Sequence, residues 1–235
     1  MHFTTTMPIK FLTRTALLFL FLLPLNGHAE LKAGRHFQAI AGDKAIVRTL
    51  WYQLGSEQQT IVATTAMRSG DYAYDAGETI TFYGDRIDAE GNPIPEAIAP
   101  VPEGASRLLL LFTELSVPNE QGLTYRVYVI EDDIQKFAFG SFHFINASTK
   151  DAGINLGGEK FLLKKGASKN VKVKPPKQGD VLINIVAHNP EDLTWSPFYS
   201  NGWGHRDNLR TLVFIIDNPQ GGVTTLRYRQ FEPTQ

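Results

Sequence analysis

Cysteine is absent from all 235 residues of the chain. Without cysteine there can be no disulfide, so the fold must be held together by its hydrophobic core. The same absence excludes thiol catalysis, Cys-ligated zinc and iron–sulfur clusters. Downstream of residue 29, no run approaches the ~20 apolar residues that a helix needs to cross a bilayer. We therefore expect no transmembrane segment in that part of the chain.

Catalytic and metal-binding motifs are also missing. There is no Gly-x-Ser-x-Gly motif, and His143, His188 and His205 do not have the spacing of a helical zinc motif. The acidic residues around Gly91 do not fit a calcium-binding loop, and a hairpin turn explains them better. The sequence therefore predicts no metal, no cofactor and no catalytic residue.

The first 29 residues have the features of a secretory signal peptide. Lys10 and Arg14 precede an apolar stretch at 16–25, and the small residues Gly27 and Ala29 follow it. This order of charge, apolar stretch and small residues is typical of a cleavable signal. We expect cleavage near Ala29 and export to the periplasm or the cell exterior as a soluble chain.

Helical periodicity is scarce in the remaining residues, whereas strand patterns are frequent. Segments rich in β-branched and aromatic residues alternate with turns that contain glycine, asparagine or aspartate. Eleven strands are predicted, at 46–54, 60–67, 79–83, 107–115, 124–130, 140–146, 160–163, 170–173, 181–187, 210–216 and 223–231. The chain is therefore expected to be an all-β protein of antiparallel sandwich type.

The second half of the sequence shows weak similarity to the first. Residues 107–112 resemble 210–215, 125–129 resemble 225–229, and 77–82 resemble 179–184, at an offset of about 100 residues. We interpret this as two tandem immunoglobulin-like sandwiches, an acidic module at 30–133 and a basic module at 134–235. One larger β-sandwich domain is the alternative.

The two halves differ in charge. Residues 30–133 hold 8 basic and 16 acidic side chains, and residues 134–235 hold 13 basic and 8 acidic ones. Such asymmetry bears on partners and not on fold. It suggests charge-driven self-association or binding to an envelope polymer or another envelope protein.

Part of this asymmetry comes from the lysine segment, residues 160–177, which holds seven lysines. Lys164, Lys165, Lys169, Lys172 and Lys174 are candidates for a patch that binds an anionic partner. Alternatively, these lysines lie on a solvated hairpin and prevent edge-to-edge pairing of sheets. A nucleic-acid partner is not expected, because Phe161 is the sole aromatic residue in the segment.

The aromatic segment, residues 195–207, is the most unusual stretch of the sequence. It is interpreted as a long connection rich in proline and glycine, and it contains Trp195, Phe198, Tyr199, Trp203, His205 and Arg206. Aromatic rings with convergent polar groups suit a sugar or a peptide. Alternatively, the rings close one end of the sandwich and the polar groups satisfy turns.

The residues from Phe142 to Ser148, with the later pairs Gly157-Gly158 and Lys165-Gly166, resemble exported β-sandwich modules of bacterial envelopes. This resemblance implies a fold and no functional residue. The expected function is a non-catalytic binding or scaffolding module of the bacterial periplasm or cell surface. The alternative is a hydrolase that acts on envelope glycan, with its site in the aromatic segment.

Overall fold

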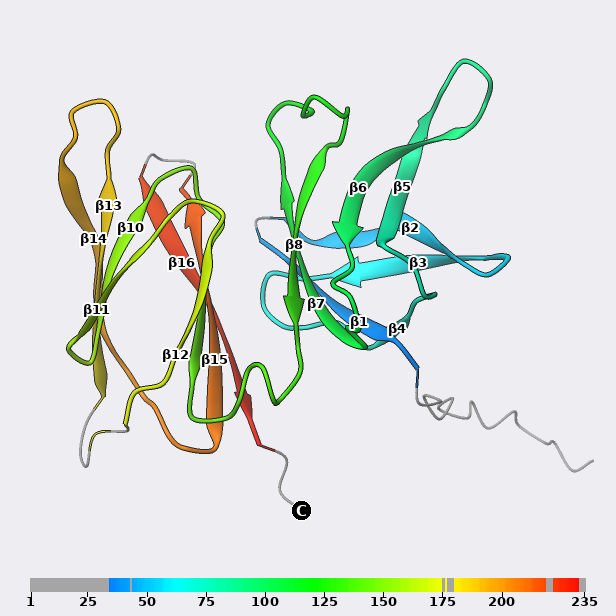
Figure 1. The fold of residues 1–235 in the computed structure, drawn as a ribbon. Helices are drawn as coiled ribbons and strands as arrows, with labels where there is room; N and C mark the ends of the chain where they lie inside the picture. Colours follow the sequence, from blue (N-terminus) through cyan, green and yellow to red (C-terminus); the bar gives the residue numbers. More distant parts are fainter. Residues whose placement is uncertain (1–33, 43, 175, 177–179, 219–221, 233–235) are drawn as a thin grey trace, which may run out of the picture. The chain divides into compact units, whose positions relative to one another are not determined.

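The computed structural model describes residues 34–42, 44–174, 176, 180–218 and 222–232. These residues form sixteen strands and no helix, which confirms the all-β prediction (Figure 1). None of them belongs to a helix that could cross a membrane. The predicted signal peptide lies outside the described residues.

The first eight strands form two four-stranded sheets. Sheet A has the order β4-β1-β7-β8 and sheet B the order β3-β2-β5-β6. The strands are β1 (His36–Ala41), β2 (Ile46–Leu54), β3 (Glu57–Ala63), β4 (Tyr72–Ala73), β5 (Thr79–Ile87), β6 (Pro93–Pro100), β7 (Arg107–Glu114) and β8 (Tyr125–Glu131).

The last eight strands form sheets C and D. Sheet C has the order β12-β9-β15-β16 and sheet D the order β11-β10-β13-β14. The strands are β9 (Phe142–Asn146), β10 (Ala152–Leu156), β11 (Glu159–Leu163), β12 (Ser168–Val171), β13 (Val181–His188), β14 (Trp195–Trp203), β15 (Leu209–Asp217) and β16 (Val223–Phe231).

The two strand sets have the same topology. Adding eight to each strand number turns the order of sheet A into that of sheet C, and the order of sheet B into that of sheet D. The three sequence similarities noted above fall on corresponding strands, namely β7 with β15, β8 with β16 and β5 with β13. Each set also contains one parallel pair, β1 with β7 and β9 with β15, which the antiparallel prediction did not include.

Each set encloses its own hydrophobic core between its two sheets. Phe37, Tyr52 and Phe82 are buried in the first core, and Phe142, Phe144 and Trp203 are among the buried residues of the second. The alternation of inward and outward side chains along the strands produces these cores. The clearest example is β13, where Val181, Ile183, Ile185 and Ala187 are buried.

A third cluster of buried residues joins the two sets. It includes Ile40, Leu109 and Leu111 from sheet A, and Leu212 and Phe214 from sheet C. Strands β7 and β15 are consequently buried on both faces, with five and seven consecutive buried residues. This explains why they are continuous apolar runs where most other strands alternate.

Polar contacts accompany this shared core. Asp132 accepts a hydrogen bond from Arg68 at 2.6 Å and forms an ion pair with Arg210 at 2.9 Å. The hydroxyl of Tyr128 on β8 donates to the carbonyl of Ala147, and that of Tyr228 on β16 donates to the carbonyl of Thr65. Because these contacts use sheets A and C, they leave the outer faces of sheets B and D for other roles.

Candidate functional site

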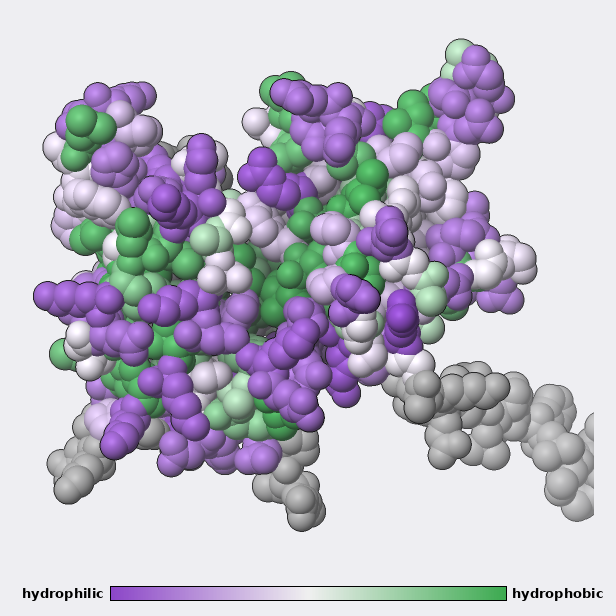
Figure 2. Space-filling model, viewed as in Figure 1, coloured by the Kyte–Doolittle hydropathy of each residue, from purple (hydrophilic) through white to green (hydrophobic). Residues whose placement is uncertain are grey.

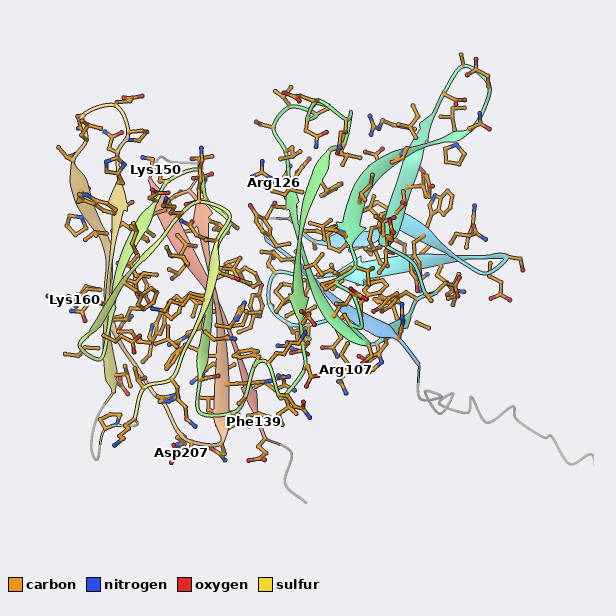
Figure 3. All side chains as sticks on the ribbon, in the orientation of Figure 1. Arg107, Arg126, Phe139, Lys150, Lys160 and Asp207 are labelled. Carbon is orange, nitrogen blue, oxygen red and sulfur yellow. The ribbon has the colours of Figure 1, made fainter. Side chains whose placement is uncertain are left out.

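The outer face of sheet D combines apolar and polar side chains in two rows. Cross-strand pairing aligns Leu162, Gly153, Val186 and Pro197 in one row, from β11 to β14. The adjacent row contains Lys160, Asn155, Asn184 and Ser200. Figure 3 shows Lys160 pointing away from β11. Inward positions of the same strands fill the second core, so strand alternation alone creates this face.

Trp195 lies against this face next to Gly153, which has no side chain. A Cβ atom at Gly153 would lie 3.5 Å from Cζ3 of Trp195 and 2.8 Å from Cγ2 of Val186. The indole therefore covers the glycine, and 46% of Trp195 remains exposed. The ring also lies 4.9 Å from that of His188. An exposed aromatic plane is thus held by contacts on β10 and β13.

Beside Trp195 the surface forms a hollow of about 430 Å³. Its lining includes Leu162, which is 52% exposed, together with Lys160, Asn155 and Asn184. Ser200 donates a hydrogen bond to Oδ1 of Asn184 at 2.7 Å, which fixes that amide. The Oδ1 atom of Asn155 is buried and has no hydrogen-bond partner among the described residues. This oxygen therefore keeps an unused capacity to accept a hydrogen bond.

The two asparagines also line a neighbouring hollow of about 570 Å³. This second hollow contains Glu159, Asp180 and Lys174. Asp180 lies over Gly202 of β14, where its Oδ2 atom would be 3.0 Å from an added Cβ. The two hollows together are therefore lined by an aromatic side chain, two amides and two carboxylates, of which Glu159 lies opposite the inward residue Leu156 at the edge of the sheet.

The aromatic segment is not the long connection that the sequence suggested. Most of it is β14, an edge strand paired with β13 through a bulge between Ile185 and Val186. Pro197 misled the prediction, since proline is rare in strands but is tolerated on a sheet edge.

The predicted residues of this segment separate on the two faces of β14. Trp203 is 1% exposed, stacks with Phe142 and donates its indole hydrogen to Tyr199 at 2.8 Å. Phe198 and Tyr199 also pack against the second core. Trp195 alone among the four aromatic residues lines the hollow described above.

The two remaining predicted residues lie beyond β14. His205 is 6% exposed, and its Nε2 atom donates to the carbonyl of Val173 at 3.2 Å. Burial lowers the pKa of this imidazole, which favours the neutral ring. Arg206 is exposed and does not line either hollow of sheet D.

The lysine segment runs along two sheet edges. Lys160 is on β11, the edge of sheet D, and Lys169 is on β12, the edge of sheet C, so the two strands do not form the hairpin of the alternative interpretation. Lys169 lies 3.7 Å from Glu159 and over the ring of Phe161. Lys164, Lys165, Lys172 and Lys174 are exposed. Figure 2 shows hydrophilic and hydrophobic surface interspersed in the region of these strands.

Asn155, Leu162 and Asn184 were not expected to contribute to a site. Asn184 could have been noticed, because it is a polar residue at an outward position of a predicted strand. Asn155 gave no such signal, because β10 was not predicted as a strand. Among the described residues, no group of three or more His, Cys, Asp or Glu side chains is arranged to hold a metal ion.

Comparison with known proteins adds no family to this description. No protein-family model matches the chain, and no curated protein matches it. Function is therefore inferred from the residues on the outer face of sheet D.

Proposed function

We propose that the chain is an exported, non-catalytic module that binds a glycan of the bacterial envelope on the outer face of sheet D. The observation that supports this proposal most directly is Trp195, which is partly exposed and lies next to Gly153 beside two amides. The predicted signal peptide supports export.

The chemistry of the face suits a sugar ring. The C–H face of a pyranose can stack on an exposed indole, while its hydroxyl or acetamido groups need hydrogen-bond donors and acceptors. Asn155 and Asn184 offer both kinds of group, and Lys160 offers a donor. Leu162 and Val186 provide apolar surface for methyl groups such as that of an acetamido substituent.

Binding of defined oligosaccharides would test the proposal. The probes are chitohexaose and cellohexaose, which differ in the acetamido group, together with purified peptidoglycan. Residues 34–235 form one compact unit, so the chain without its predicted signal is a suitable sample. We expect binding to at least one probe, weakened about tenfold or more by Trp195→Ala, which corresponds to about 1.4 kcal/mol.

The matched control is Leu193→Ala, since Leu193 is 74% exposed and does not line the hollow. Equal binding by wild type and Trp195→Ala would overturn the proposal. Binding of apolar peptides to the same face, without binding of any of the glycans, would also overturn the proposal.

A glycan hydrolase is the second candidate, because Glu159 and Asp180 line the hollow next to the two amides. Glycoside hydrolysis uses a pair of carboxyl groups. Release of reducing ends from chitohexaose or peptidoglycan would support this candidate, provided that Glu159→Gln and Asp180→Asn each abolish it. Binding without release supports the non-catalytic proposal.

A further inference from the structure

Sheet B is the topological equivalent of sheet D, and its outer face also carries aromatic side chains. Trp51 on β2 pairs with Thr60 on β3 and with Tyr83 on β5, so the three residues form one row across the sheet. The next inward positions, Tyr52 and Phe82, are buried in the first core. The row therefore faces away from that core.

The two aromatic rings of this row are fixed relative to each other. Their centroids are 4.7 Å apart with 27° between the ring planes. The indole nitrogen of Trp51 donates to the carbonyl of Gly84 at 3.3 Å. Both residues remain partly exposed. A stacked pair held by its own sheet needs no reordering before a ligand binds, which lowers the cost of binding.

Polar groups lie beside Tyr83, one member of this pair, as polar groups lie beside Trp195 on sheet D. A hollow of about 250 Å³ is lined by Tyr83, Gln53, Thr81 and Asp75. The carboxylate of Asp75 accepts a hydrogen bond from the backbone of Gly55 at 2.7 Å, which fixes its position. Amide, hydroxyl and carboxylate groups next to an aromatic surface are the groups that bind sugar hydroxyls.

We propose that the outer face of sheet B is a second glycan-binding site, so that one chain holds a polysaccharide at two places. This inference rests on the proposed function of sheet D. A repeating polymer offers both faces the same ligand, so two weak sites would act together. Shared core packing between sheets A and C is consistent with this, because it leaves B and D uncovered.

The test combines site number with polymer affinity. Calorimetry with chitohexaose is expected to show two sites per chain for wild type, and one site for Trp195→Ala or Trp51→Leu. Retention on insoluble chitin or peptidoglycan is expected to fall at least a hundredfold in each single variant, since avidity contributes about 10²–10⁴. Val47→Ala is the control, because Val47 is on β2 and 60% exposed but lies outside the row.

The outcomes separate the two proposals. One site in wild type, lost in Trp195→Ala and unaffected in Trp51→Leu, overturns the second site and leaves the proposed function intact. One site lost in Trp51→Leu and unaffected in Trp195→Ala overturns the assignment to sheet D. No binding of chitohexaose, cellohexaose or peptidoglycan by wild type overturns both.

If the Trp51→Leu variant does not fold, two other variants still test the second site. Gln53→Ala and Thr81→Ala each remove a polar group from the hollow, and neither residue belongs to the first core. Each is expected to weaken the second site at least threefold and to leave the site on sheet D unchanged. Unchanged binding at both sites in these variants would count against the proposal.

Discussion

Gly153 lies beside both Val186 and Trp195, and its backbone is not in the left-handed region. We therefore expect Gly153→Ala to be compatible with the strand but to displace the side chain of Val186, which lines the hollow beside the indole. Glycan binding should weaken about threefold to tenfold while circular dichroism remains unchanged. Gly70→Ala is the matched control, since no atom lies within 4 Å of the added Cβ there. Equal affinities of the two variants would contradict the explanation.

His205 gives the protein a stability that depends on pH. Burial lowers its pKa, and burial also lowers that of His143. Below about pH 6.5 an unfolded histidine takes up a proton that the folded one resists, so the unfolded state binds more protons and stability falls as the pH falls. The urea midpoint should therefore be lower at pH 5.5 than at pH 7.5.

The variant His205→Gln keeps a donor for the Val173 carbonyl and removes the titrating group. It should reduce the difference between the two urea midpoints, measured by the fluorescence of the tryptophans. His143→Gln should reduce it as well. A pH dependence identical to that of wild type in both variants would be evidence against the burial argument.

The sequence could identify Trp195 as a candidate, but it could not show that Trp195 is exposed and Trp203 is buried. The two residues are eight positions apart and lie on opposite faces of β14, because the bulge at Phe198 changes the alternation. A bulge depends on pairing with β13 and leaves no mark in the local pattern. Asn155 is a similar case, since its role depends on strands that are distant in the sequence.

At the scale of elements, we expect Lys160 on β11, Lys169 on β12 and Lys172 directly after β12 to protect two sheet edges. Lysine on an edge strand disfavours pairing with another chain. Lys169→Val combined with Lys172→Val should therefore cause self-association that increases with protein concentration, as measured by light scattering. The control is the double change to arginine, which keeps the charge. A monomer at all concentrations in the valine variant would show that the edges are protected by other means.

The same lysines are candidates for binding an anionic envelope polymer. Lys172→Glu with Lys174→Glu reverses two exposed charges. If these residues form an anionic-partner patch, retention on a polyanionic polymer at low salt should fall at least fivefold. Unchanged retention would contradict the anionic-partner patch, and protection of the sheet edges would remain as the explanation for these lysines.

Strand prediction succeeded where side chains have a clear periodicity or are continuously apolar. β2, β7, β13 and β15 are such strands, and each lies inside its sheet. β6 and β14 were missed, because both are edge strands in which prolines occur. The two-residue strand β4 is too short to carry a pattern. The inner strands β1 and β10 were not predicted either, whereas the edge strands β3, β8, β11, β12 and β16 were. The pattern within a strand, and not its place in the sheet, therefore decided whether it was predicted.

At the scale of the whole molecule, Asp132 neutralises two arginines that are largely buried. The side chains of Arg68, Arg210 and Asp132 are 16%, 6% and 4% exposed. Asp132→Ala should cost about 3–5 kcal/mol of unfolding free energy, because it leaves buried charges without a partner.

Urea denaturation would measure this cost. The control is Glu114→Gln, which removes a surface ion pair with Lys44 and should cost about 0–1 kcal/mol. Equal costs for the two changes would mean that the ion pairs around Asp132 do not stabilise the shared core.

The topological repeat could be anticipated from three short similarities, but the contact between its two copies could not. The runs in β7 and β15 indicate burial on both faces and do not identify what covers the second face. Arg210 was not identified as part of a buried cluster, because its partner Asp132 is 78 positions earlier.

The parallel pairs of β1 with β7 and of β9 with β15 also affect the folding rate. His36 pairs with Arg107 and Phe142 with Thr211, so each central sheet forms only when about 70 residues of intervening chain have been gathered. High contact order of this kind slows folding to milliseconds or seconds. For a chain that is threaded through a membrane before it folds, this delay would keep it competent for translocation.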